Sequence, residues 1–343
     1  MAKGARLLLA TFVAVCACGG SSVPTSPAPP SAPPSPTAGS TIARIVDSLN
    51  NGRPIAGASV STDTLGTATS NADGYVTLQA TGGLAHTIRV SAPSWVERLT
   101  LLKVPGEQTT VSLIPQTLPL GYFDEMCRSF GSVARWRTAP ALVVETSVLQ
   151  YASRTATTDT VPADLVARTM EEVRRTLPIL SSNRFPEFAS IEVRTTAAGT
   201  ASAVPDGAIG LTWQRGLAGG FGHVAYGNRV RGADGWLIRG EVALDYDWHA
   251  LHLPAGSRTD YFNVVQHEQG HTLGYSHTKT APSFMYEVYL MTVSGLDRQA
   301  FEVYMQRPSG NQTPDVDPTG VTLNLLAPSE EMLTPRCAFL RVK

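Results

Sequence analysis

The chain has 343 residues, of which 43% are hydrophobic and 16% are charged, and its formal net charge is −1 at pH 7. A chain of this length and apolar content can bury a full core, and we expect two domains. The near-neutral charge argues against nucleic acid as a partner, and the cysteines are too few for a disulfide scaffold.

Residues 1–18 have the features of an export signal. Basic residues precede an apolar stretch at 7–17 that is too short to span a bilayer as a helix. Val15-Cys16-Ala17-Cys18 resembles the bacterial lipobox. The resemblance implies that Cys18 is lipidated, so that a lipid anchor holds the protein in the membrane of the bacterial cell envelope, at the outer membrane or cell surface. The alternative is a plain secretory peptide, which would leave a secreted or periplasmic protein.

Residues 19–40 consist almost entirely of Ser, Pro, Ala, Thr and Gly, without a charge. Such a segment cannot bury enough apolar surface to offset the entropy lost on ordering. Its proline content favours extended polyproline II, which predicts a semi-rigid linker.

Short alternating runs separated by turn signals characterise residues 41–116. The strand-like runs lie at 42–46, 56–60, 75–78, 87–90 and 111–114, with Asn51-Gly52 and Asp73-Gly74 as turns between them. This spacing predicts a small all-β sandwich. Residues 54–60 and 71–75 resemble the carboxypeptidase-regulatory-like, transthyretin-type module, which implies a spacer or adhesion role.

Residues 117–343 alternate strand-like and helix-like segments, which predicts an α+β domain. The expected strands lie at 141–144, 191–194, 209–213, 223–226 and 241–246. Helical spacing of apolar residues predicts one helix after Pro162, one that starts near residue 260, and a last one that ends before Pro308. Asp315 and Asp317 lack the ligand density of a calcium loop, and we interpret them as turn residues.

The helix predicted to start near residue 260 carries the chemistry. His267 and His271 are four residues apart, so both imidazoles project from one face toward one point. Two nitrogen ligands of a tetrahedral zinc ion need this spacing. Glu268 lies beside them, where its carboxylate can reach a metal-bound water, and Gly274 lets the helix stop and turn. The turn brings His277 back as a third ligand, so we predict one catalytic Zn²⁺.

The pattern His-Glu-x-x-His-x-x-Gly-x-x-His resembles the signature of the metzincin zinc endopeptidases. Residues 282–286, Pro-Ser-Phe-Met-Tyr, resemble the methionine turn of this family, in which Met285 would form an apolar platform beneath the metal. The resemblance implies a mixed, mostly parallel sheet with an active-site helix. It also implies hydrolysis of peptide bonds in a peptide or protein substrate by a metal-activated water, with Glu268 as general base.

The family resemblance also implies where substrate binds. In metzincins an antiparallel edge strand above the zinc helix pairs with extended substrate. By order along the chain its counterpart lies around 222–226, so Gly222, His223 and Val224 are candidate substrate contacts. Tyr286, directly after the methionine as in the matrixin arrangement, is a further candidate.

Two functions stay open from the sequence. The first is a monomeric zinc endopeptidase tethered to the cell envelope. The second is a surface adhesion or binding lipoprotein whose β module is the working part and whose metal site is not catalytic. The presence of Glu268 together with all three histidines favours the first.

Cys127 and Cys337 are the two thiols that remain once the signal is removed and Cys18 is acylated. In an exported, oxidising compartment we predict a disulfide between them, which would close a loop of about 210 residues. In the alternative, Pro335-Arg336-Cys337 resembles the matrixin cysteine switch, in which a thiolate occupies the open zinc position. The glycine that follows in that motif is missing here.

Overall fold

The computed structural model describes residues 34–35, 38–79, 84–217, 225–247, 258–286, 292–318 and 331–333. These residues belong to one compact unit, Pro33–Lys343. The predicted signal peptide, Cys18 and most of the predicted linker lie outside the described residues. Among the described residues, no helix is both long and apolar enough to cross a membrane.

Residues 40–113 form two small sheets around one hydrophobic core. The first sheet has the strand order β4-β1-β7 and the second β3-β2-β5-β6. The bounds are β1 (Ser40–Asp47), η1 (Asn50–Gly52), β2 (Ser59–Thr62), β3 (Gly66–Thr69), β4 (Tyr75–Gln79), β5 (Leu84–Ser91), β6 (Arg98–Val104) and β7 (Thr109–Leu113). Alternate residues of both sheets, such as Ile45, Val60 and Ile88, point into the shared core. β1, β4, β5 and β7 coincide with predicted runs, whereas β3 and β6 have no predicted counterpart.

The rest of the described chain is built on one large sheet of eight strands. They are β8 (Ala141–Glu145), β9 (Ser147–Gln150), β10 (Ala156–Thr160), β11 (Ile191–Arg194), β12 (Ala208–Arg215), β13 (Ala225–Arg231), β14 (Leu237–Asp245) and β15 (Glu331–Leu333). β11, β8, β12 and β14 run parallel in that order, and β13 is antiparallel to β14. The mixed, mostly parallel sheet that the metzincin resemblance implied for this region is thus confirmed.

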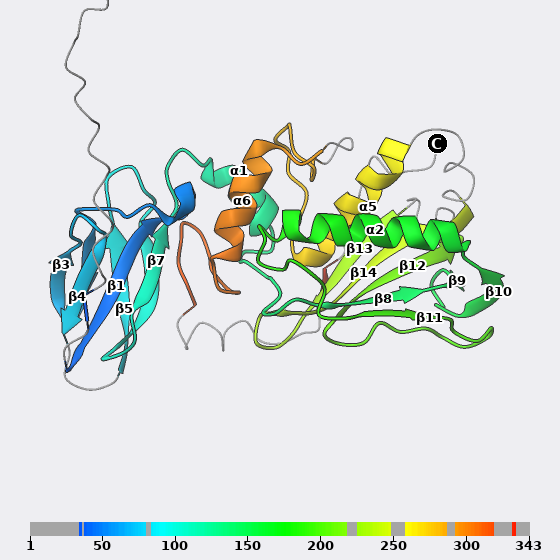
Figure 1. Ribbon diagram of the computed structural model, residues 1–343, viewed down its shortest axis with the longest axis horizontal. Coiled ribbons are helices and arrows are strands. Elements are labelled where there is room, and N and C mark those ends of the chain that lie inside the picture. Colours follow the sequence, from blue (N-terminus) through cyan, green and yellow to red (C-terminus); the bar gives the residue numbers. More distant parts are fainter. Residues whose placement is uncertain are drawn as a thin grey trace, which may run out of the picture. The chain divides into compact units, whose positions relative to one another are not determined.

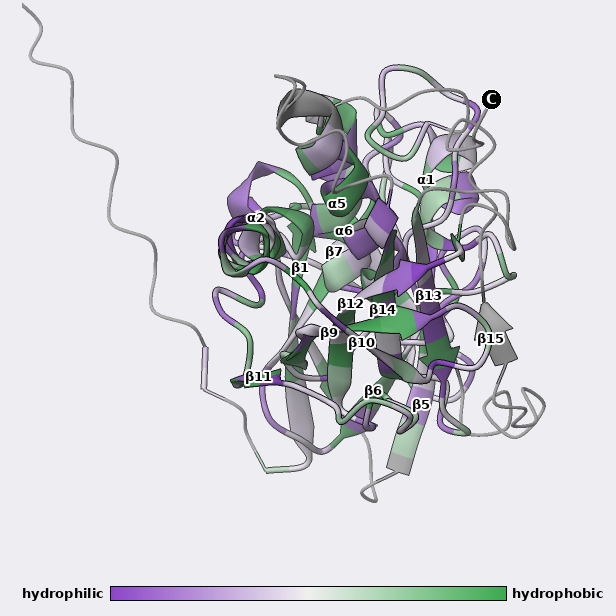
Figure 2. Ribbon diagram, turned by 90° about the vertical axis from the view of Figure 1, so that its right-hand side faces the viewer, coloured by the Kyte–Doolittle hydropathy of each residue, from purple (hydrophilic) through white to green (hydrophobic). Residues whose placement is uncertain are grey.

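Four helices accompany this sheet in the described residues: α1 (Leu120–Cys127), α2 (Ala163–Leu180), α5 (Arg258–Leu273) and α6 (Gly295–Met305). α2 and α5 lie along the same face of the sheet and pack against each other (Figure 1). Figure 2 shows hydrophobic residues along β12 and β14. Every residue of β12 from 208 to 214 is buried, as expected for a strand covered on both faces.

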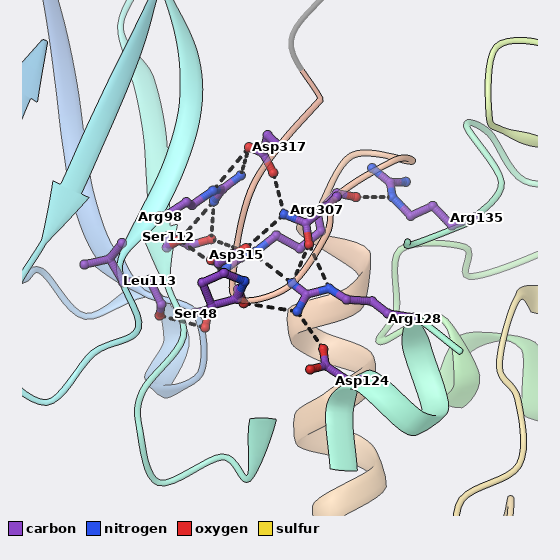
Figure 3. A network of polar contacts seen from close by, with 12 residues as sticks. Ser48, Arg98, Ser112, Leu113, Asp124, Arg128, Arg135, Arg307, Asp315 and Asp317 are labelled. Atoms are coloured by element: carbon purple, nitrogen blue, oxygen red, sulfur yellow. Dashed lines mark hydrogen bonds and ion pairs between the residues drawn. The ribbon is translucent and has the colours of Figure 1, made fainter. Parts of the chain in front are cut away.

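A buried network of charges joins the two small sheets to the segment that follows α6 (Figure 3). Arg98 of β6 pairs with Asp317 at 2.6 Å, and Arg307 pairs with Asp315 at 2.7 Å. Arg307 also donates to the backbone oxygen of Ser112 in β7. Burial alone would raise the pKa of Asp315, but the guanidinium groups of Arg307 and Arg98 lower it below its ordinary value. Asp315 lies in a turn, as predicted, and both aspartates also accept hydrogen bonds from arginines of this buried network.

Candidate metal centre

Residues 264–273 of α5 are buried, and the sheet approaches this part of the helix closely at two glycines. On β13, a Cβ added at Gly227 would lie 2.3 Å from the backbone oxygen of Glu268 and 2.7 Å from Cβ of His271. On β14, a Cβ at Gly240 would lie 2.9 Å from Cβ of Thr272. These two glycines let the backbone of the sheet touch α5 and fix its height above the strands.

Backbone carbonyls set the tautomers of the two histidines on α5. Nδ1 of His267 lies 2.8 Å from the oxygen of Phe284, and Nδ1 of His271 lies 2.8 Å from the oxygen of Tyr275. A carbonyl oxygen can only accept, so both Nδ1 atoms carry the proton and donate. The two Nε2 atoms are therefore left with lone pairs, which is the form in which imidazole binds a metal.

The three predicted ligands meet at their Nε2 atoms. Nε2 of His277 lies 3.1 Å from Nε2 of His267 and 3.2 Å from Nε2 of His271. A tetrahedral zinc ion with Zn–N bonds of about 2.05 Å separates its ligand nitrogens by roughly 3.3 Å. Nε2 of His277 can donate a proton to at most one of its two neighbours. Without a cation between the rings, the lone pairs of at least two nitrogens would therefore face each other. The donor set thus fits a divalent cation, and zinc in particular.

The charge state of the histidines agrees with this role. Burial lowers the pKa of His267 to about 3, and repulsion from His277 adds to the effect. Burial likewise lowers the pKa of His271 well below its ordinary range. Both side chains are therefore neutral at physiological pH, as metal ligands must be.

Gly274 ends α5 and starts the turn toward His277. The amide of Tyr275 donates to the oxygen of Gly270, and the amide of Gly274 donates to the oxygen of His271. This pair of bonds defines a Schellman motif with Gly274 at the left-handed position, where φ is +115°. A Cβ there would lie 1.9 Å from the hydroxyl of Tyr304, so the glycine predicted from the motif is required sterically as well.

Helix α1 holds the turn that carries His277. The amide of Ser276 donates to the oxygen of Met126 at 2.8 Å. The hydroxyl of Thr278 and the amide of Lys279 donate to the carboxylate of Glu125, at 2.7 and 3.0 Å. The third candidate ligand is thus positioned by an element separate from α5.

The predicted methionine turn lies directly beneath α5. Met285 is fully buried, and a Cβ at Gly270, between the two ligands of the helix, would lie 2.9 Å from its sulfur. The turn is anchored by Asp297 of α6, whose carboxylate accepts from the hydroxyl of Ser283 at 2.6 Å and the amide of Phe284 at 3.2 Å. The same carboxylate accepts from the amide of Ser294 and so closes the capping box of α6.

The structure therefore brings the three predicted ligands together and places Met285 against Gly270 of α5. Glu268 follows His267 on α5 and is fully buried. Tyr286 is partly buried and forms an isolated bridge with Thr278. Gly222, His223, Val224 and Cys337 lie outside the described residues. Cys127 is buried and carries no disulfide within the described part of the chain, and burial raises the pKa of its thiol. The predicted disulfide stays a prediction.

Several residues of the site were not predicted from the sequence: Asp297, Glu125 and Arg229. The spacing Ser294-x-x-Asp297 is a capping-box signal that could have located the start of α6. Nothing in the sequence indicates that the same carboxylate also holds the methionine turn. The other two contact the turn that carries His277: Glu125 accepts from the hydroxyl of Thr278, and Arg229 donates to the backbone oxygen of Tyr275. Both lie far from this turn along the chain.

Comparisons with known proteins agree with this geometry. The matrixin family model (Peptidase_M10) matches residues 209–301, which run from β12 through the histidine cluster to α6. No curated protein matches the chain. Similar solved structures include two interface mutants of a type II cohesin–X-dockerin complex from Acetivibrio cellulolyticus. They are 15% and 16% identical, with TM-scores of 0.19 and 0.18, and the matches cover 22% and 21% of this chain.

The chain spans about half the length of those solved chains, 55% and 51%, and a likeness this small carries no argument about fold or function. The matrixin match, in contrast, covers all three histidines and the methionine turn. It supports a metzincin-like metalloprotease domain in this part of the chain.

Proposed function

We propose that the chain is a zinc-dependent endopeptidase in which His267, His271 and His277 bind one Zn²⁺. The observation that carries the proposal is the convergence of three Nε2 atoms, with separations of 3.1 and 3.2 Å from the central His277. The neutral tautomers enforced on His267 and His271 support it, because neutral imidazole ligands do not reduce the charge of the ion that is available for catalysis.

Glu268 is the proposed proton acceptor. A zinc ion bound at the cluster would act as a Lewis acid on a water molecule and on the scissile carbonyl. Glu268 directly follows the first ligand on α5. Its carboxylate would take the proton of the attacking water and pass it to the leaving amine.

We propose an extended polypeptide as substrate, bound as a further strand along the outer edge of β13. Because Gly227 has no side chain, β13 packs directly against the backbone of Glu268. A chain added along β13 would therefore lie next to the metal centre. The edge accepts a strand in antiparallel orientation, since β15 pairs with Arg229–Arg231 in that way. The candidate contacts Gly222, His223 and Val224 immediately precede β13 in the sequence.

We also propose that the enzyme acts as a lipoprotein of the cell envelope, with Cys18 as the lipidated residue and residues 19–40 as its tether. The two small sheets would then be a module between the tether and the catalytic region. In cells, Cys18→Ser should move the protein from the membrane fraction to the soluble fraction. A protein that stays in the membrane fraction after this change would refute the anchor.

The decisive experiment for the activity uses Glu268→Ala in the chain without its first 40 residues. This variant should keep one zinc per chain and lose hydrolysis of a denatured protein substrate. Glu171→Ala, which removes an exposed glutamate of α2, is the matched control and should keep wild-type activity. The proposal fails if Glu268→Ala digests the substrate as fast as the wild type.

A further inference from the structure

A buried arginine lies directly behind the turn that carries His277. Arg229 of β13 is 1% exposed, although a guanidinium is costly to remove from water. Nη1 donates to the backbone oxygens of His271 and Tyr275, both at 2.9 Å, and Nη2 donates to the hydroxyl of Ser276 at 2.8 Å. All three acceptors belong to the metal ligands or to the residues between them.

The acceptors of Arg229 are the ones that orient the ligands. The oxygen of Tyr275 also accepts from Nδ1 of His271, which fixes the tautomer and ring plane of that ligand. The oxygen of His271 also accepts from the amide of Gly274 in the Schellman motif. Ser276 is the residue before His277. One planar guanidinium therefore bonds to the ends of the segment that joins the second ligand to the third.

No carboxylate among the described residues forms an ion pair with Arg229. Its positive charge instead lies against carbonyl oxygens at the C-terminal end of α5, where the helix dipole is negative. A group held only by neutral acceptors stays charged and buried when it makes several good hydrogen bonds. The fork of Arg229 has three such acceptors within one turn, which a shorter or nonplanar donor could not reach together.

We propose that Arg229 is a positioning residue of the metal centre, which sets His271 and His277 at the separation that zinc requires. This inference rests on the proposed zinc site. Through its hydrogen bonds, Arg229 connects the edge strand β13 to the segment that carries two of the three ligands. A residue that only capped α5 would affect the stability of the metal-free protein and leave the affinity of the folded protein for zinc unchanged.

The test compares Arg229→Met with Arg231→Met. Arg231 lies two residues further along the same strand and donates to Gly235, Ser132 and Val133, none of which is a ligand or adjoins one. The zinc Kd of each folded chain is measured by competition with a chromogenic chelator. Cobalt substitution reports geometry, because four-coordinate Co²⁺ absorbs visible light more strongly than five- or six-coordinate Co²⁺.

We expect Arg229→Met to weaken zinc binding by about 10- to 100-fold and to reduce the cobalt absorption. Arg229→Lys, which keeps the charge and can reach part of the acceptor set, should restore part of both. Arg231→Met should bind zinc as the wild type does. The inference is wrong if Arg229→Met keeps the wild-type Kd and spectrum, or if Arg231→Met loses as much affinity.

Ser276→Ala covers the case in which Arg229→Met does not fold. It removes the hydroxyl that accepts from Nη2 of Arg229 and from the hydroxyl of Ser129. It should weaken zinc binding by a smaller factor than Arg229→Met, whereas Ser129→Ala should not; a wild-type Kd in Ser276→Ala would overturn the inference. A wild-type chain that binds no zinc would instead refute the proposed function, so the two failures are distinguishable.

Discussion

The contact between Gly227 and α5 allows a steric test of the site in which none of the three histidines is substituted. In Gly227→Ala the new Cβ would start 2.3 Å from the oxygen of Glu268, whereas ordinary contacts begin near 3.4 Å. Strand and helix must therefore separate by about 1 Å. His267 and His271 would move with α5, while His277 stays with the turn held by α1. Metal–ligand distances tolerate only about 0.2 Å.

We expect Gly227→Ala to destabilise the metal-free protein by about 1–3 kcal/mol, the usual cost of overpacking. The melting temperature should fall by roughly 2–4 °C for each kcal/mol. Zinc affinity should fall at least about tenfold, because the helix ligands shift relative to His277. Differential scanning fluorimetry and chelator competition measure the two effects. Gly295→Ala is the control, since its Cβ meets nothing within 4 Å. Unchanged stability and zinc affinity in Gly227→Ala would refute the proposed packing.

Three further predictions concern other parts of the chain. Because the folded pKa of Asp315 is lowered, its contribution to stability is present above the unfolded value of about 3.9 and is lost as pH falls through the folded pKa. In urea unfolding between pH 7 and 3, the free energy of unfolding should therefore fall less with decreasing pH in Asp315→Asn than in the wild type. An equal fall in both proteins would contradict this. β15 pairs with the outer edge of β13 and runs toward Ala225, so deletion of residues 331–333, which leaves Cys337 in the chain, should raise kcat/KM for long peptides. An unchanged value would exclude competition by β15. A disulfide between Cys127 and Cys337 predicts no free thiol in the unfolded, unreduced protein and stabilisation of up to about 5 kcal/mol, whereas a cysteine switch predicts a free thiol and higher activity after alkylation.

The cluster of three histidines that could hold a metal was predictable because its geometry is local. The spacing of His267 and His271 is a property of one helix, and Gly274 with His277 is a property of the turn that ends it. The long helices and central strands followed from periodicity for the same reason. Met285 was predicted through a family resemblance, and the structure places it against Gly270, where only a residue without a side chain leaves room for its sulfur.

Features that depend on distant partners could not be predicted. α1 is a single short helix, and its value to the site comes from Glu125 and Met126, whose partners lie about 150 residues further along the chain. Arg98 belongs to β6, and its partner Asp317 lies 219 residues further along the chain. Asp315 lies in a turn, as predicted, but the buried ion pairs of Asp315 and Asp317 could not be predicted, because a turn and a buried ion pair use the same side chain and only burial separates the two.

The central claim is that His267, His271 and His277 bind one catalytic zinc ion. The most direct measurement is anomalous diffraction at the zinc edge from crystals of the zinc-loaded Glu268→Ala protein. We predict one peak about 2.0–2.1 Å from Nε2 of each of the three histidines, in tetrahedral positions with the fourth left to solvent. The account would be contradicted by a histidine cluster that holds no zinc at full occupancy, or by a zinc ion whose ligands do not include His277.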